Sequence, residues 1–339
     1  MASLSSNGSA NAQTSHDVRV PVAADALAQA WGRLPASYGI PSVAPSLIEA
    51  EAYCQRLATS HYENFGVVSW FLPKELHQHF FNIYSYCRIS DDLGDEVGDP
   101  RLSLLLLDRW EQELDAMYSS LDGGEARPTH PVFVALAGTV AKFGIPKHEF
   151  SDLLTAFRQD QTVTRYETFD DLLGYCKNSA NPVGHLVLYL CGYGDNERQL
   201  LSDYTCTALQ LANFWQDVAV DWEKNRVYLP LEDLRRFKVR EEDIAARRAS
   251  MEFREMLKFE VARAREWFDR GLPLIKQVKP SLALDIELFS RGGQEILTAI
   301  EKQDYDVLSR RPTISKLRKT GLLLRARAGP RGHRHRDAS

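Results

Sequence analysis

Apolar residues recur at intervals of three and four from Ser46 to about Leu324, which is the period of helices with one buried face. The repeats stop where Gly and Pro cluster, as in "GDP" at 98, "FGIP" at 143 and "GYGD" at 192. Clear examples are "SLIEAEAYCQRLAT" (46–59), "RLSLLLLDRWEQELDAMYSSL" (101–121), "TFDDLLGYCKNSA" (168–180), "LLSDYTCTALQLANFWQDVAVDWEKN" (200–225) and "SMEFREMLKFEVARAREWFDRGLPLI" (250–275). No convincing series of alternating apolar and polar positions, which would indicate strands, accompanies them. We therefore predict a single all-α domain of many helices.

Two flanking segments lack this pattern, and we place the domain between them, at residues 45–324. Residues 1–44 mix Ser, Ala, Asn and Pro and predict a disordered tail, with one short helix at "ADALAQAWGRL" (24–34). Residues 325–339 form a basic tail, and the adjoining "SKLRKTGLLLRARA" (315–328) suits an anionic membrane surface. A helix end followed by a solvated tail explains the same charges more simply.

Composition narrows the class of protein. A hydrophobic fraction of 44% and a charged fraction of 26% are ordinary for a globular protein, and the net charge of −5 argues against a partner that is nucleic acid. The five cysteines are dispersed without a CxxC pair, which predicts reduced thiols and no structural zinc site. No run of about 18 apolar residues and no signal peptide are visible. We therefore expect a cytoplasmic protein, with peripheral binding at the inner membrane face as an option.

An acidic segment, "YCRISDDLGDE" (86–96), directly follows the apolar and aromatic "HFFNIYSY" (79–86). On a helix, Asp91 and Asp95 lie on one face with Asp92 beside them, and Tyr84 and Arg88 continue the stripe. Like charges this close repel one another, and a divalent cation with oxygen ligands, typically Mg²⁺, relieves the repulsion. A solvated acidic helix end is the alternative, and the DDxxD pattern alone is only suggestive.

A second polar stripe lies in "QLANFWQDVAVDWEKNRVYLP" (210–230), where Asn213, Asp217 and Asp221 are spaced by four residues. The spacing alone carries little information in a chain this acidic. The rest of this helix is apolar or aromatic, as shown by Leu211, Phe214, Trp215, Val218 and Trp222. Bundles build metal sites from polar side chains on facing helices, so two such stripes would hold several cations around one diphosphate.

Basic and hydroxyl groups near the two stripes suit a phosphate ligand. Besides Arg88, "DQTVTRY" (160–166) contributes Asp160 and Arg165, and "NRVYLP" (225–230) contributes Arg226 and Tyr228. The guanidinium group of Arg binds phosphate oxygens in bidentate fashion. For any single one of these arginines, a surface ion pair is the commoner role.

Six pieces in this order resemble the head-to-head prenyl synthases, a family that includes squalene, phytoene and dehydrosqualene synthases. The pieces are "HYENF" (61–65), "YSYCRISDDLGDE" (84–96), "DQTVTRY" (160–166), "YCKNSANPVG" (175–184), "ANFWQDVAVDWEKNRVYLP" (212–230) and "QDYDVLSRRP" (303–312). The resemblance covers about residues 55–324, most of the chain. Within the family the segments are most similar to the bacterial hydroxysqualene synthases of hopanoid biosynthesis.

The resemblance implies an isoprenoid-synthase helical bundle around a central apolar tunnel, with Mg²⁺ and the diphosphate of a prenyl substrate at the tunnel mouth. It also implies other squalene-pathway enzymes as partners. The catalytic, metal-binding positions it implies are Asp91, Asp92, Asp95, Asn213, Asp217 and Asp221. The diphosphate-binding positions it implies are His61, Arg88, Arg165, Arg226 and Tyr228, and those near the reacting centre or the tunnel are Tyr84, Tyr175, Tyr305 and Phe65.

Two departures from the family pattern make the expected pocket more polar. Phytoene and dehydrosqualene synthases usually carry Arg before the first Asp of the second motif, whereas this chain has Gln216. Their "VAG" segment is "SAN" here, ending at Asn181. We therefore expect presqualene diphosphate as the substrate, ionised and then captured by one water to give hydroxysqualene. Asn181, Gln216 and Tyr175 are candidates for orienting that water, and the sequence does not choose between them.

The aromatic side chains near the motifs have two interpretations. Tyr84, Phe65, Phe214 and Trp215 could stabilise cationic intermediates, although core packing is their commoner role. Two other functions stay open at this point. One is condensation of two prenyl diphosphates to presqualene diphosphate, squalene or phytoene, and the other is a non-catalytic helical protein that binds isoprenoids or membranes.

Overall fold

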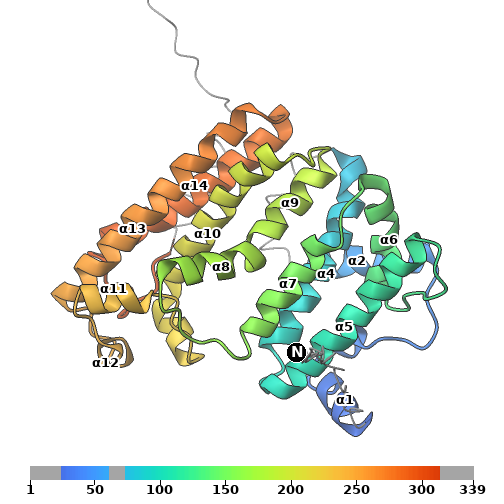
Figure 1. Ribbon diagram of the computed structural model, residues 1–339, viewed down its shortest axis with the longest axis horizontal. Helices are drawn as coiled ribbons and strands as arrows, with labels where there is room; N and C mark the ends of the chain where they lie inside the picture. Colours follow the sequence, from blue (N-terminus) through green and yellow to red (C-terminus); the bar gives the residue numbers. More distant parts are fainter. Residues whose placement is uncertain (1–23, 61–72, 314–339) are drawn as a thin grey trace, which may run out of the picture.

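The computed structural model describes residues 24–60 and 73–313, and these residues form a helical bundle. Its α-helices are α1 (Ala24–Trp31), α2 (Leu47–Ser60), α4 (His77–Asp95), α5 (Pro100–Leu121), α6 (Pro131–Phe143), α7 (His148–Gln159), α8 (Phe169–Ser179), α9 (Asn181–Leu190), α10 (Asn196–Glu223), α11 (Leu231–Arg236), α12 (Glu241–Ala245), α13 (Met251–Gly271) and α14 (Pro280–Lys302). The 3₁₀ helices are Ala36–Tyr38, Lys74–Leu76 and Leu272–Lys276. No strand occurs within these ranges, where a single bridge joins Arg165 to Val227. The predicted all-α class is confirmed (Figure 1).

Local signals set several of the helix ends. Helix α5 begins after Asp99, whose side chain accepts hydrogen bonds from the first free backbone N–H groups, and Pro100 occupies the first turn. Helix α8 begins with a capping box in which Thr168 and Asp171 satisfy each other's backbone donors. Helix α6 ends at Gly144, whose positive φ of 63° suits a residue without a Cβ. These ends fall where Gly, Pro and Asp interrupt the apolar repeats.

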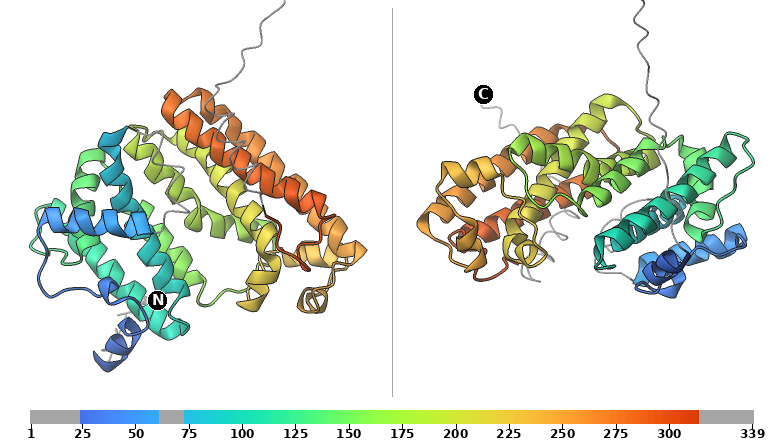
Figure 2. Two further views of the ribbon diagram at one scale, coloured as in Figure 1. Left: turned by 180° about the vertical axis from the view of Figure 1, so that it is seen from behind. Right: turned by 60° about the horizontal axis from the view of Figure 1, so that its bottom comes forward.

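The 28-residue helix α10 lies at the centre of one half of the molecule, packed against α9, α13 and α14 (Figures 1 and 2). Its core includes Trp215, Phe253 and Phe268, all essentially inaccessible to solvent. The other half packs α2, α4, α5, α6 and α7 around a second core with Tyr86 and Trp110 at its centre. Helix α4 and the C-terminal half of α10 thus belong to different halves of the bundle, which meet at the polar cavity described below.

Residues 24–44 differ from the disordered tail that we expected up to residue 44. The short helix expected there is present as α1, and it packs against α5 with Ala30 fully buried. Tyr38 is 3% exposed, and Arg33 donates a hydrogen bond to the carbonyl oxygen of Val97 at 2.8 Å. A few apolar side chains therefore dock this segment on the domain, although its Ser, Pro and Gly content resembles that of a loop.

Some expectations fall outside the described residues. His61 and Phe65 lie in the segment 61–72, and the basic tail with the adjoining segment 315–328 lies beyond residue 313. Among the helices that the structure describes, none is both long and apolar enough to cross a membrane. Peripheral binding to a membrane stays a prediction.

Candidate functional site

A polar cavity of about 290 Å³ opens between α4, α7, α8 and α10 and the segment that follows α10. The expected site residues that line it are Asp91, Asp95, Tyr175, Asn213, Asp217, Asp221, Arg226 and Tyr228. The two carboxylate stripes that the sequence predicted on separate helices therefore face one common cavity. Their catalytic and metal-binding roles stay predictions.

Five carboxyl groups line this cavity, because Asp160 from the end of α7 joins the four expected aspartates of the two stripes. Burial, followed by the nearby charge of Asp95, raises the pKa of Asp91 to about 6. Burial, followed by the charge of Asp217, raises the pKa of Asp221 to about 7, and burial raises the pKa of Asp160 to about 6. The cavity thus holds more negative charge than its own residues neutralise, which is the condition that a bound cation relieves.

Two basic side chains partly balance this charge at Asp95. Arg226 and Lys224 bind its carboxylate oxygens at 2.9 Å and 3.0 Å. Burial alone would raise the pKa of Asp95, but the hydrogen bonds and charges of Arg226 and Lys224 hold it below its usual value. Arg226 was expected here, whereas Lys224 was missed, although it follows Asp221 by three residues at the end of α10.

Asp92 does not line the cavity, in contrast to our expectation that it flanks Asp91 and Asp95. It is 5% exposed, and it accepts hydrogen bonds from the Tyr38 hydroxyl at 2.7 Å and from Nε of Arg88 at 3.0 Å. One residue further along an α-helix, a side chain points about 100° away, which turns Asp92 toward the docked N-terminal segment. Arg88 is thereby held by Asp92, with a longer contact of 3.7 Å to Asp91.

Aromatic side chains from α8, α10 and the segment after α10 also line the cavity, namely Tyr175, Phe214 and Tyr228. The rings of Tyr228 and Phe214 stack with centroids 3.9 Å apart, and Tyr166 stacks on Tyr228 at 5.8 Å. Tyr175 donates a hydrogen bond from its hydroxyl group to Asp160 at 2.9 Å. The cavity therefore combines carboxyl groups with the faces of aromatic rings, both of which attract cations.

Several residues that the sequence predicted at the site do not line the polar cavity and contact other parts of the protein instead. Arg165 binds Glu241 at 2.8 Å and the carbonyl oxygen of Asn225 at 2.7 Å. Asn181 is buried and accepts a hydrogen bond from Thr207 at 3.1 Å. Tyr84 and Tyr305 are also outside the lining, and Tyr305 packs after the end of α14 with a positive φ of 57°.

Gln216 also turns away from the cavity. Its side chain is buried and donates a hydrogen bond to the carbonyl oxygen of Pro312 at 2.6 Å. Arg311, which the sequence analysis did not single out, donates to Asp217 at 3.0 Å. Nothing in the local sequence indicates these contacts, because they join residues more than ninety positions apart.

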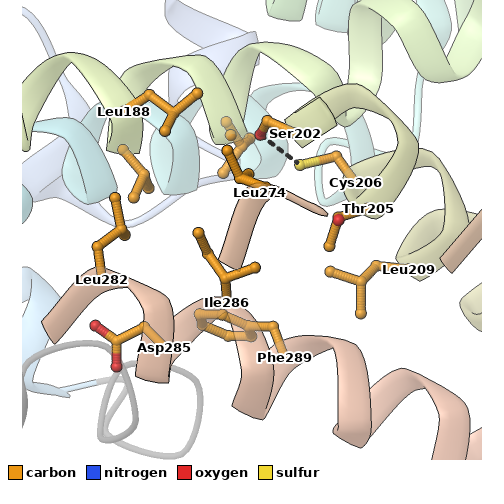
Figure 3. A pocket seen from close by; sticks show the side chains of 13 residues that line it. Leu188, Ser202, Thr205, Cys206, Leu209, Leu274, Leu282, Asp285, Ile286 and Phe289 are labelled. Atoms are coloured by element: carbon orange, nitrogen blue, oxygen red, sulfur yellow. Dashed lines mark hydrogen bonds between the residues drawn. The ribbon is translucent and has the colours of Figure 1, made fainter. Parts of the chain in front are cut away.

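An apolar pocket of about 200 Å³ lies beside the N-terminal half of α10 and is walled by α9, α10 and α14 (Figure 3). Ser202, Thr205, Cys206 and Leu209 line it from α10. At 1.5 Å per residue, Thr205 and Asp217 are about 18 Å apart along the helix axis. Helix α10 therefore lines an apolar pocket near its N-terminal end and the polar cavity near its C-terminal end.

The cavity residues suit Mg²⁺ by their chemistry, since all candidate ligands are carboxylate or amide oxygens. Within residues 24–60 and 73–313, no three His, Cys, Asp or Glu side chains converge closely enough to ligate one ion by themselves. Mg²⁺ typically takes only one or two carboxylates and completes its shell with water and substrate phosphate. Pairs of acids on α4 and α10 fit that pattern better than a cage made of protein ligands alone.

Comparison with known proteins gives the family. The family model for squalene/phytoene synthase matches residues 58–318, well over half of the chain. The chain belongs to the squalene/phytoene synthase family. It is therefore an enzyme of isoprenoid biosynthesis, and its helical bundle is the isoprenoid-synthase fold.

Proteins similar to this member of the squalene/phytoene synthase family include phytoene synthases and squalene synthases. A phytoene synthase from Arthrospira platensis is 29% identical over 280 residues, which cover 78% of this chain and 89% of that protein. The crystal structure of squalene synthase HpnC from Alicyclobacillus acidocaldarius is 42% identical, with a TM-score of 0.72 over 81% of this chain and 98% of that one. A dehydrosqualene synthase solved with a ligand is 24% identical with a TM-score of 0.73, covering 83% of this chain and 96% of that one, which shows a shared fold.

Proposed function

We propose that this enzyme converts presqualene diphosphate and water to hydroxysqualene and diphosphate, in the squalene branch of the family. The observation that carries the proposal is that α10 lines an apolar pocket near one end and a cavity with five carboxyl groups near the other. A substrate with a hydrocarbon body and a diphosphate end matches this arrangement. The identity of 42% to a squalene synthase, compared with 29% to the phytoene synthase named above, supports the squalene branch.

The cavity residues divide the work between binding and positioning. Asp91 and Asp95 on α4 and Asn213, Asp217 and Asp221 on α10 would hold Mg²⁺, which neutralises the leaving diphosphate when it is bound. Arg226 and Lys224 lie at the same wall and provide donors for phosphate oxygens. The carbon–oxygen bond to diphosphate breaks, and the cyclopropylcarbinyl cation that remains rearranges by opening a carbon–carbon bond of its three-membered ring. The resulting allylic cation forms a bond to the water oxygen, and the proton of that water leaves with the diphosphate.

Of the three candidates for orienting the water, Tyr175 has the best position. It lines the cavity, and because its hydroxyl group donates to Asp160 at 2.9 Å, its oxygen remains able to accept a hydrogen bond from water. Asn181 and Gln216 are buried in contacts with Thr207 and Pro312. We therefore assign the water to Tyr175 within this proposal.

The deciding experiment separates the substrates. Purified protein with Mg²⁺ is incubated with presqualene diphosphate and, separately, with farnesyl diphosphate, and the products are identified by mass spectrometry. We expect hydroxysqualene from presqualene diphosphate and no product from farnesyl diphosphate alone. Turnover of farnesyl diphosphate alone would establish the second candidate, condensation of two prenyl diphosphates, which the similarity to phytoene synthases favours. Absence of diphosphate release from every prenyl diphosphate would leave only a binding protein.

A further inference from the structure

The segment Ser309–Thr313, here called the C-terminal strap, runs back from the end of α14 and crosses α10 beside the second acidic stripe (Figure 2). Two contacts fix its course. Nε2 of Gln303 donates to the carbonyl oxygen of Arg310 at 2.9 Å, and Nε2 of Gln216 donates to the carbonyl oxygen of Pro312 at 2.6 Å. The strap is thus tied to α14 at one point and to α10 at another.

Both polar atoms of the Gln216 side-chain amide form hydrogen bonds with the strap. Its nitrogen holds the strap at Pro312, and its oxygen accepts a hydrogen bond from Nη2 of Arg311 at 3.3 Å. The side chain is 5% exposed, so these partners replace water that burial has removed. A carboxylate could not donate to Pro312, and an apolar side chain could hold neither partner, which makes an amide the fitting group at this position.

The arrangement places the Arg311 guanidinium group on Asp217. Nε of Arg311 and Oδ1 of Asp217 are in close contact, and Nη2 of Arg311 binds Oδ2 at 3.0 Å. The pair therefore uses both oxygens of a carboxylate that lines the polar cavity. Asp221, one turn further along α10, has no ion pair among the described residues, which shows that the strap neutralises one acid of this stripe selectively.

We propose that Gln216 is a positioning residue for the C-terminal strap, and that docking of Arg311 on Asp217 competes with the binding of a divalent cation at that carboxylate. The proposal rests on the proposed function only in requiring that cations bind at the second acidic stripe. Because linkage is reciprocal, a cation at Asp217 weakens docking of the strap, and loss of the strap contact strengthens binding of the cation. Gln216 sets the balance, because it holds Arg311 where it reaches Asp217.

The test measures cation affinity and strap exchange in the whole protein, without turnover. Mn²⁺, which prefers the same oxygen ligands as Mg²⁺, is titrated by electron paramagnetic resonance, and hydrogen exchange is followed in the peptide that contains the strap. We expect Arg311→Gln to bind Mn²⁺ about threefold to tenfold more tightly than wild type, because a half-exposed ion pair contributes modestly. Arg311→Lys, which keeps the charge, should stay near wild type.

Gln216→Leu should speed exchange in the strap at least about tenfold and tighten Mn²⁺ binding by less than Arg311→Gln, since the guanidinium group stays in the chain. Arg310→Gln is the matched control, because the Arg310 side chain is exposed and, among the residues that the structure describes, Arg310 forms a hydrogen bond only through its backbone oxygen. Added Mn²⁺ should itself speed exchange of the wild-type strap.

Equal Mn²⁺ affinity in wild type, Arg311→Gln and Gln216→Leu would overturn the proposal and reduce the Arg311 contact to an ordinary ion pair. Unchanged strap exchange in Gln216→Leu would overturn the role of Gln216. Failure to make hydroxysqualene is a separate result from the substrate experiment, so each idea can fail without the other. Absence of Mn²⁺ binding in wild type would overturn the competition itself.

Discussion

The polar cavity and the apolar pocket are both lined by α10 and differ in what surrounds a carboxyl group. In the cavity, Asp95 has Arg226 and Lys224 as partners, and Asp217 has Arg311. In the pocket, Asp285 is 2% exposed, and neither of its oxygens has a hydrogen-bond partner among the described residues. The polar cavity thus contains several carboxyl groups, some of them with basic partners, whereas the apolar pocket contains one buried carboxyl group in apolar surroundings.

In the proposed function, one helix contributes to binding both ends of an amphiphilic substrate. Both sites take side chains from α10, which is 28 residues long. The chemistry of these side chains changes from Ser202 and Cys206 near one end to Asp217 and Asp221 near the other. Predictions that alter one region and spare the other test whether this division is functional.

The largest effect is expected from the acids of the cavity. Asp91→Asn and Asp217→Asn, made separately, each remove one negative charge from the proposed Mg²⁺ site, and each should lower diphosphate release from the proposed substrate at least about 100-fold. Steady-state rates over a range of Mg²⁺ concentrations measure the effect. Asp269→Asn, an exposed acid near the end of α13, is the control and should keep the wild-type rate. Full activity in both variants would remove the cavity from the mechanism.

A smaller effect is expected where α14 approaches α10 behind the apolar pocket. A Cβ at Gly293 would meet the ring of Phe268 at 2.4 Å and Cδ2 of the pocket residue Leu209 at 2.8 Å. Gly293→Ala should therefore lower the free energy of unfolding by about 1–3 kcal/mol, measured by urea denaturation.

The neighbouring Gly292 provides a matched control for Gly293. A Cβ at Gly292 meets no atom within 4 Å, and Gly292→Ala should raise the free energy of unfolding by about 0.5–1 kcal/mol because Ala favours the helix. Equal stabilisation by both substitutions would contradict this prediction and would show that the packing around Gly293 accommodates a methyl group.

The sequence predicted the features that depend on local spacing. Helices follow from the period of apolar residues, and the stripes of Asp91 with Asp95 and of Asp217 with Asp221 follow from four-residue steps. The resemblance to the family then placed both stripes at one site, and the structure shows that they face the same cavity. Local rules were sufficient here because each stripe belongs to one helix.

Other contacts depend on packing between distant segments, and spacing could not predict them. Tyr38 reaches Asp92 across 54 positions, which turns an expected site residue toward the N-terminal segment. Gln216 binds the carbonyl oxygen of Pro312, 96 positions further along the chain, and this contact turns Gln216 away from the polar cavity, where we expected it. Asp285 carries no motif at all and is notable only because folding buries it without a partner.

The last effect is expected at Asp285, the acid of the apolar pocket (Figure 3). Burial raises the pKa of its carboxyl group to about 7, so the folded protein keeps this proton up to a higher pH than the unfolded chain, whose Asp residues ionise near 4. Between about pH 4 and pH 7 the native state binds more protons, and the free energy of unfolding falls as the pH rises. At pH 8, Asp285→Leu should raise that free energy by about 1–2 kcal/mol, because an unpaired polar group leaves the interior.

At pH 4 the gain from Asp285→Leu should shrink, since the carboxyl group is then largely protonated in the folded protein and ionises only partly in the unfolded chain. Asp285→Asn separates charge from polarity: it should remove the pH dependence of this group while gaining less stability, because its amide remains without a partner. Urea denaturation at several pH values gives both quantities, with the exposed Asp269→Leu as the control. A loss of stability in Asp285→Leu at pH 8 would show that Asp285 has a stabilising partner, and the contrast between the two regions of α10 would then be one of degree.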